Sequence, residues 1–226
     1  MAANKEKYHE IKEELNLQNV QLIAVSKMQS VADIQGLYEL GQRDFGENYV
    51  QELIEKQPLL PPDIRWHFIG HLQTNKVKYV SDIVSLIQSV DSLKLLKEIN
   101  KQAKKLNKVI NCLLQVHIAE EETKFGLDIN ELDEIIDLVK NNFAGFSNIH
   151  ISGLMGMASF SEDLTKVRNE MKHLQSIFEK YKTLSTSNCQ LFTLSMGMSG
   201  DYKMAIEEGS NMVRIGSLLF GARPRK

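Results

Sequence analysis

Short apolar runs alternate along the chain with longer segments in which apolar residues recur every three to four positions. The runs predict strands and the longer segments predict helices, because the two elements have different periods. The predicted strands cover residues 21–26, 43–46, 65–69, 83–88, 109–117, 149–154, 189–194 and 211–215. The predicted helices between them cover residues 30–41, 47–57, 74–80, 92–107, 130–141, 161–182 and 200–208. This alternation is typical of the α/β class.

Two helical patterns carry more detail. Tyr8, Ile11 and Leu15 recur at helical spacing and predict an extra helix before the first strand. Ser161 is a start signal for the helix over residues 161–182. The predicted apolar stripe of that helix consists of Leu164, Val167, Met171, Leu174, Phe178 and Tyr181.

Eight strands separated by single helices fit either a closed (β/α)8 TIM-type barrel or an open doubly wound sheet. The strand count and the shortness of the strands favour the barrel. No shift in composition or Pro/Gly/Ser-rich linker divides the chain, and the proline cluster at 57–63 indicates a loop. We therefore expect one barrel domain over residues 1–226.

Composition restricts the classes of partner. Lys and Arg number 27 against 29 Asp and Glu, a net charge of -2, so no overall positive field is available to hold nucleic acid or an anionic membrane. No apolar stretch reaches the length of a membrane span. Cys112 and Cys189 lie in apolar stretches without a CxxC motif, which indicates reduced thiols in a cytoplasmic protein. His150 and His173 have no ligand-like neighbours, so we expect no metal site.

The carboxyl ends of the strands are the candidate functional positions, because barrels of this type place their reactive groups there. The first strand ends at Lys27, the second runs into Asn48, and the third carries His67. The last two strands end in glycine and serine residues, namely Gly197, Ser199, Gly200, Gly216 and Ser217. Glycine allows close backbone approach and serine can donate a hydrogen bond, so these two loops predict a phosphate site, although tight turns explain each loop taken singly.

Lys27 then lies beside a predicted phosphate site, because the first and eighth strands are neighbours in a closed barrel. A lysine and a phosphate site together suit pyridoxal 5′-phosphate, which forms a Schiff base with a lysine amine. Partial desolvation of Lys27 would lower its pKa and expose the neutral amine. The alternative is that Lys27 merely extends its charge to solvent at a strand end.

Arg214 interrupts the apolar eighth strand between Val213 and Ile215, so we expect it to have a partner inside the barrel. It could donate to a pyridine nitrogen, which would keep that nitrogen unprotonated and weaken the ring as an electron sink. The alternative is an interior salt bridge to a carboxylate such as Glu47.

Several motifs together resemble the pyridoxal phosphate homeostasis proteins from about residue 20 to residue 221. These motifs are AVSK, FGENYVQE, WHFIGHLQTNK, TKFG, GLMGM, LSMGMSGDY and NMVRIGSLLFG. The resemblance implies a barrel like the N-terminal domain of alanine racemase, without that enzyme's second domain. It implies a covalent cofactor on Lys27 and Arg214 facing the pyridine nitrogen. The phosphate contacts that it implies are Met198, Ser199, Gly216 and Ser217, and the implied ring contacts are Asn48 and His67.

The resemblance also implies a function. Lys124 in TKFG matches a second lysine suspected of handling the cofactor during transfer, although a solvated loop lysine explains it equally well. Racemisation needs a second acid/base group, which the racemases take from a domain that we expect to be absent here. We therefore expect a monomeric carrier that holds pyridoxal phosphate and passes it to acceptor enzymes, and is not an enzyme. The alternatives are a weakly active racemase or lyase, or a barrel that binds a sugar phosphate with Lys27 as a simple cation.

Overall fold

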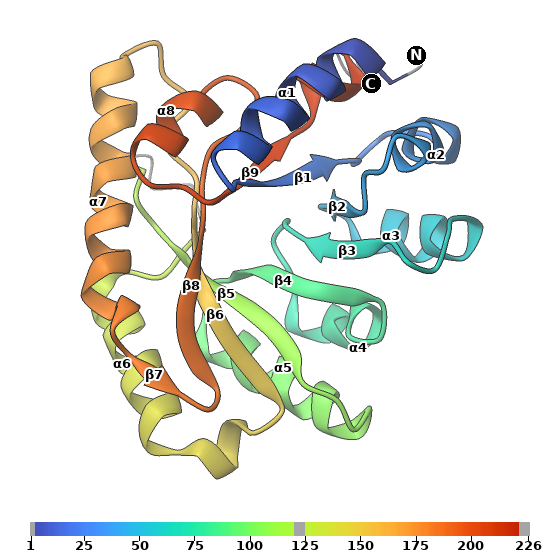
Figure 1. The fold of residues 1–226 in the computed structure, drawn as a ribbon. Coiled ribbons are helices and arrows are strands. Elements are labelled where there is room, and N and C mark those ends of the chain that lie inside the picture. Colours follow the sequence, from blue (N-terminus) through green and yellow to red (C-terminus); the bar gives the residue numbers. More distant parts are fainter. Residues whose placement is uncertain (1–2, 120–124, 222–226) are drawn as a thin grey trace.

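The protein is a closed barrel of eight parallel strands in the computed structural model, which describes residues 3–119 and 125–221 (Figure 1). The barrel strands are β1 (Gln21–Val25), β2 (Asp44–Glu47), β3 (Arg65–Phe68), β4 (Val84–Val90), β5 (Ile110–Val116), β6 (Ile149–Gly156), β8 (Cys189–Ser195) and β9 (Met212–Ile215). Pairing of β1 with β9 and of β6 with β8 closes the ring. The predicted barrel is therefore confirmed, and the open doubly wound sheet is wrong.

The helices lie on the outside of the barrel (Figure 1). They are α1 (Lys5–Leu17), α2 (Val31–Glu39), α3 (Val50–Lys56), α4 (Val77–Val80), α5 (Leu93–Lys105), α6 (Ile129–Asn141), α7 (Leu164–Lys182), α8 (Tyr202–Glu207) and α9 (Ser217–Phe220). Short 3-10 helices cover Gln57–Leu59, Thr74–Lys76 and Phe143–Phe146. The extra helix before the first strand is thus confirmed as α1, which buries Tyr8, Ile11 and Leu15.

Two apolar layers hold the barrel together. The larger one lies between the strands and the surrounding helices. The smaller one consists of Ile23, Leu86, Leu113, Met155 and Met212. Parallel strands covered by helices on one side and by interior side chains on the other have little solvent contact, which explains why β2 and β9 are buried along their whole length.

Several predicted boundaries are wrong by a few residues. Helix α7 begins at Leu164, because the carboxylate of Asp163 caps the N–H groups of Thr165 and Lys166, while Ser161 lies outside the helix. The Leu164 side chain is exposed and does not join the buried stripe. The small elements that were not predicted include α9, the 3-10 helix at Phe143–Phe146, and a two-residue strand, β7 (Ser185–Thr186), which pairs antiparallel with β8.

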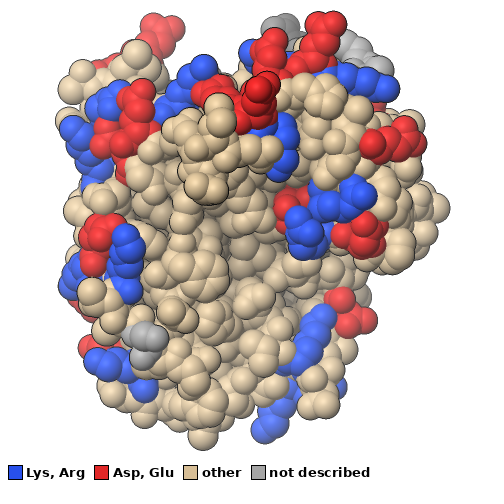
Figure 2. All heavy atoms as spheres, in the orientation of Figure 1, with Lys and Arg blue, Asp and Glu red and all other residues tan. Residues whose placement is uncertain are grey.

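Charged side chains of both signs are interspersed around one face of the molecule, and the centre of that face is mostly uncharged (Figure 2). Neither sign gathers into a continuous patch on this face. Among the helices of the described ranges, none combines the length and the apolar character that crossing a bilayer requires.

Candidate functional site

A cavity of about 370 Å³ lies at the carboxyl ends of the barrel strands. Its lining includes Val25, Lys27, Asn48, Ile69, Met157, Phe160, Met198, Ser199, Gly200, Asp201, Arg214, Gly216 and Ser217. Val25 belongs to β1, Arg214 to β9 and Ser217 to the start of α9, and the other lining residues lie in loops that follow strands. The cavity size falls within the range of small-molecule pockets. Seven of the eight residues expected to bind the cofactor line this cavity, and the eighth, His67, does not.

Lys27 lies two residues beyond the end of β1 and lines the cavity. Both of its neighbours in the chain are held by a cluster of charged side chains that includes residues of α3. The Lys56 amine donates to the carbonyl oxygen of Ser26 at 2.9 Å, and the N–H of Met28 donates to the Glu52 carboxylate at 2.7 Å. Met28 has a φ of 62°, a left-handed conformation that is uncommon for a residue with a side chain. These two contacts restrain the backbone on each side of Lys27.

The ions of this cluster are Glu47, Glu52 and Lys56. The Lys56 amine contacts Glu47 at 2.9 Å and Glu52 at 2.7 Å, and the Ser26 hydroxyl donates to Glu47 at 2.7 Å. Burial raises the pKa of Glu47, while Lys56 and Ser26 oppose that rise. Glu47 therefore pairs with Lys56, and the predicted alternative of a Glu47–Arg214 salt bridge is wrong.

Arg214 projects from β9 into the interior and lines the cavity. Its guanidinium donates to the Ser195 hydroxyl at 2.6 Å and to the Gly156 carbonyl oxygen at 2.9 Å. Burial lowers the pKa of Arg214 to about 10, partly offset by the charge of Asp201. Arg214 is thus a fixed cation at the wall of the cavity, held by neutral oxygens.

The loops after β8 and β9 meet at the cavity. The N–H of Gly216 donates to the Ser199 hydroxyl oxygen at 3.2 Å, which ties the two loops together. Among the described residues, no acceptor is found for the backbone N–H groups of Ser199, Gly200, Ser217 and Leu218. Four free donors on two adjoining loops form a suitable environment for an anion.

Met198 does not contribute its backbone N–H in the way that was expected. That N–H already donates to the carboxylate of Asp201 at 2.5 Å. Gly197, with a φ of 95°, makes this turn possible, and a Cβ there would lie 2.6 Å from the Cβ of Ala205. Asp201 also places a negative charge in the lining of the cavity.

Asn48 follows β2 and lines the cavity with an amide oxygen that is buried and has no hydrogen-bond partner in the part of the chain described. Gly70 allows this arrangement, because a Cβ at that position would lie 2.3 Å from the Asn48 carbonyl oxygen. A buried acceptor without a donor is costly, so the site favours a ligand that donates a hydrogen bond there.

Comparison with known proteins assigns the sequence to a family. The sequence profile described as "Alanine racemase, N-terminal domain" matches residues 1–224. A pyridoxal phosphate homeostasis protein of Pasteurella multocida is 39% identical over 209 residues, which cover 90% of this chain and 87% of that protein. The chain belongs to the pyridoxal phosphate homeostasis proteins, within the alanine racemase N-terminal domain family.

Solved structures agree with this assignment. PipY of Synechococcus elongatus, solved with PLP bound, superposes with a TM-score of 0.85 at 32% identity, covering 96% of this chain and 99% of that one. An alanine racemase of Clostridium difficile superposes with a TM-score of 0.74 at 16% identity, covering all of this chain and 59% of the racemase. The second likeness shows the shared barrel fold.

Two residues expected in the site of this family member are not part of the described cavity. His67 lies lower in the barrel, where its ring nitrogens contact Asp44 at 3.1 Å and Gln88 at 3.0 Å, and it is not among the lining residues. Both nitrogens are therefore occupied by protein groups. Lys124 lies outside the described residues.

Other site residues were not predicted. Asp201 follows the expected phosphate loop, but its return contact with Met198 depends on a turn that composition does not reveal. Phe160 lines the cavity while its side chain is 94% exposed. Lys56 resembles an ordinary lysine near a helix end, and only the fold shows that it is buried. Within residues 3–119 and 125–221, no group of three or more His, Cys, Asp or Glu side chains could hold a metal ion.

Proposed function

We propose that this protein binds pyridoxal 5′-phosphate covalently at Lys27 and serves the homeostasis of that cofactor. One observation carries the proposal: a lysine, a fixed arginine and a set of free backbone donors line the same cavity. The family relationship supports it, since relatives are named pyridoxal phosphate homeostasis proteins and PipY was solved with PLP bound.

The residues present fit the demands of the cofactor. Pyridoxal phosphate supplies an aldehyde that a lysine amine binds covalently, together with a phosphate and a ring that carries a hydroxyl and a nitrogen. Lys27 provides the amine, and the free N–H groups of Ser199, Gly200, Ser217 and Leu218 provide phosphate donors. The unpartnered Asn48 oxygen would accept a hydrogen bond from a donor on the ring, and Arg214 would be the residue beside the ring nitrogen.

The protein's own groups then act by holding and orienting. The cluster of Glu47, Glu52 and Lys56 restrains the backbone around Lys27, so the amine is presented from a rigid strand end. The Ser199–Gly216 hydrogen bond keeps the two phosphate-binding loops in register. Arg214, a cation whose guanidinium donates to two neutral oxygens, would disfavour a protonated ring nitrogen beside it.

We infer a carrier role without a turnover reaction. Among the described residues that line the cavity there is no tyrosine, histidine or cysteine to serve as a second acid/base group. Arg214 opposes strong carbanion chemistry for the reason given above. A racemase or lyase of low activity is the second candidate, favoured by the shared barrel of the alanine racemases.

The proposal extends to the setting of the protein. A carrier has acceptors, so we propose pyridoxal phosphate-dependent enzymes as partners and Lys124 as a transfer lysine. We further propose a monomer that consists of one domain and works in the cytoplasm, where Cys112 and Cys189, both buried and free, stay reduced.

Binding of three ligands to the cofactor-free protein tests the proposal against the sugar phosphate alternative. Pyridoxal phosphate, pyridoxal and a sugar phosphate are compared by ultrafiltration, with Ser217→Ala as a variant. We expect pyridoxal phosphate to bind most tightly and pyridoxal at least about tenfold more weakly, because several hydrogen bonds to a charged group are lost. Binding of the sugar phosphate without binding of pyridoxal phosphate would overturn the proposal.

A further inference from the structure

A chain of hydrogen bonds runs through the barrel interior from the cavity to the opposite end. Arg214 donates to Ser195 at 2.6 Å, Ser195 donates to Gln88 at 2.8 Å, and the Gln88 amide nitrogen contacts His67 Nδ1 at 3.0 Å. His67 Nε2 contacts Asp44 at 3.1 Å. All five side chains are buried.

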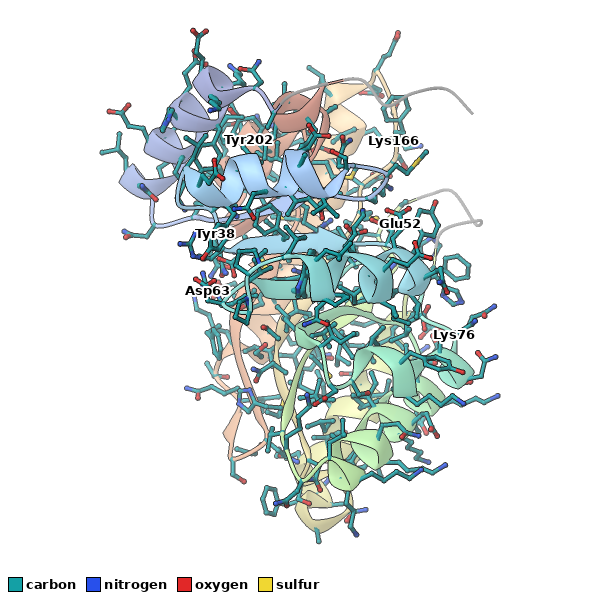
Figure 3. All side chains as sticks on the ribbon, turned by 90° about the vertical axis from the view of Figure 1, so that its right-hand side faces the viewer. Tyr38, Glu52, Asp63, Lys76, Lys166 and Tyr202 are labelled. Atoms are coloured by element: carbon teal, nitrogen blue, oxygen red, sulfur yellow. The ribbon has the colours of Figure 1, made fainter. Side chains whose placement is uncertain are left out.

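The far end of this chain is an ion pair. Arg65 donates to both oxygens of Asp44, at 2.7 and 2.6 Å. Burial alone would raise the pKa of Asp44, but the hydrogen bonds from His67 and Arg65 outweigh it and hold that pKa well below its usual range. Asp44 is the first residue of β2 and lies at the amino ends of the strands. Tyr38 and Asp63 lie at the same end of the barrel (Figure 3). Figure 3 shows this end across the molecule from Glu52, Lys76 and Lys166. The chain thus connects the two ends of the barrel.

The hydrogen bonds between Arg214 and Asp44 all run in the same direction, from donor to acceptor. A guanidinium can only donate, so the Ser195 oxygen accepts from Arg214 and its own O–H points to the carbonyl oxygen of Gln88. The Gln88 amide nitrogen must then donate, and His67 Nδ1 must accept. The remaining proton of a neutral His67 ring lies on Nε2 and points to Asp44, which as a carboxylate can only accept.

We propose that His67, Gln88 and Ser195 are positioning residues that form a relay, which fixes the Arg214 guanidinium in the cavity and couples it to the Asp44–Arg65 pair. The relay gives His67 a role although it does not line the cavity. Each link of the relay joins one donor to one acceptor, and reversing one member leaves a buried group unpaired, so the members hold one another in place. The effect of the relay on binding of pyridoxal phosphate rests on the proposed function, whereas the relay itself does not depend on it.

Nitrogen NMR of the cofactor-free protein tests the relay. A guanidinium whose two terminal nitrogens are both held by hydrogen bonds shows separate N–H resonances for them. The variant Arg214→Lys assigns these resonances, because they are lost from its spectrum. Two matched variants differ in what faces Gln88: His67→Asn keeps an acceptor there, and His67→Leu removes it. We expect the Arg214 resonances to persist in the first variant and to be lost by averaging in the second, although residue 67 does not touch Arg214.

A second set of variants guards against misfolding and local effects. Gln88→Met interrupts the relay elsewhere and should also remove the separate Arg214 resonances. Ser152→Ala is the control, because Ser152 is a buried barrel serine that donates to the Cys112 carbonyl oxygen and not to the relay. Pyridoxal phosphate should bind about tenfold more weakly to the interrupted variants, the equivalent of one lost hydrogen bond.

The outcomes separate the two proposals. Unchanged Arg214 resonances in folded His67→Leu or Gln88→Met protein would overturn the relay, whatever the protein binds. Loss of the resonances in those variants together with no binding of pyridoxal phosphate by the natural sequence would support the relay and overturn the proposed function. Loss of the resonances in Ser152→Ala as well would contradict the relay, because any buried change would then release Arg214.

Discussion

The Lys56 amine donates to the carbonyl oxygen of Ser26, the residue that precedes Lys27, across 2.9 Å of the buried interior. This contact joins α3 to the end of β1, and the same amine also contacts the carboxylates of Glu47 and Glu52. Lys56, which nothing in the sequence distinguishes from other lysines, thus helps to hold the backbone next to Lys27, the lysine that we propose binds the cofactor.

Lys56→Met should destabilise the fold by about 3–5 kcal/mol at neutral pH, because it removes the cation that faces the buried Glu47 carboxylate. The pKa of Glu47 is already raised by burial, and without Lys56 it rises further. A carboxyl group whose pKa is raised by folding destabilises the folded state increasingly as pH rises above its pKa in the unfolded chain. The loss of unfolding free energy should therefore be larger at pH 8 than at pH 5. Denaturant unfolding at both pH values measures it. Lys101→Met, which removes an exposed lysine paired with Glu98, should cost within about 0.5 kcal/mol.

Asp44→Asn should lower the free energy of unfolding by about 1–3 kcal/mol at pH 7 by removing the charge that faces Arg65 and His67. The pKa of Asp44 is held below its usual range, so its ionisation stabilises the folded state above about pH 4. That contribution is lost as pH falls through the folded pKa, and the variant and the natural sequence should converge in acid. A constant difference at every pH would contradict this, as would an equal cost for the exposed Asp82→Asn.

Much of the fold could be predicted because its signals are local. The apolar periods of α1 and of the eight barrel strands depend on near neighbours in the chain, and the rule for strand ends located Lys27, Asn48 and Ser199 at the cavity. The error over the start of α7 arose because Ser161 and Asp163 are both good capping residues.

The parts that were missed depend on contacts between distant segments. A salt bridge to Glu47 was the alternative to a pyridine nitrogen as the partner of Arg214, but Arg214 donates to Ser195 and Lys56 pairs with Glu47. His67 was expected at the ring because of the family resemblance, yet Asp44 and Gln88 hold it below the cavity. Such choices among polar partners need the three-dimensional neighbours.

Asp201→Asn should bind pyridoxal phosphate several-fold more tightly. The amide oxygen can still accept from the Met198 N–H, while the negative charge that lies in the same cavity as the phosphate donors is removed. Pyridoxal, which lacks the phosphate, serves as the control ligand, and its affinity should stay unchanged. Equal gains for both ligands would show that Asp201 does not act on the phosphate.

Gly197→Ala should destabilise the protein by about 2 kcal/mol or more and weaken phosphate binding. Its φ of 95° disfavours a side chain, and the added Cβ would meet Ala205 at 2.6 Å. Gly36→Ala is the matched control, since Gly36 lies within α2 with no atom within 4 Å of a new Cβ, and should stabilise the fold by about 0.5–1 kcal/mol. Thermal unfolding of both variants measures the contrast.

Covalent attachment at Lys27 is the central claim, and borohydride reduction followed by peptide mapping tests it most directly. The protein is incubated with pyridoxal phosphate, reduced, digested and analysed by mass spectrometry, with Lys27→Ala treated in parallel. We expect a visible absorbance band before reduction and a single major adduct on Lys27, both lost in the variant. Adduct spread over surface lysines, or an equal band in Lys27→Ala, would contradict the account.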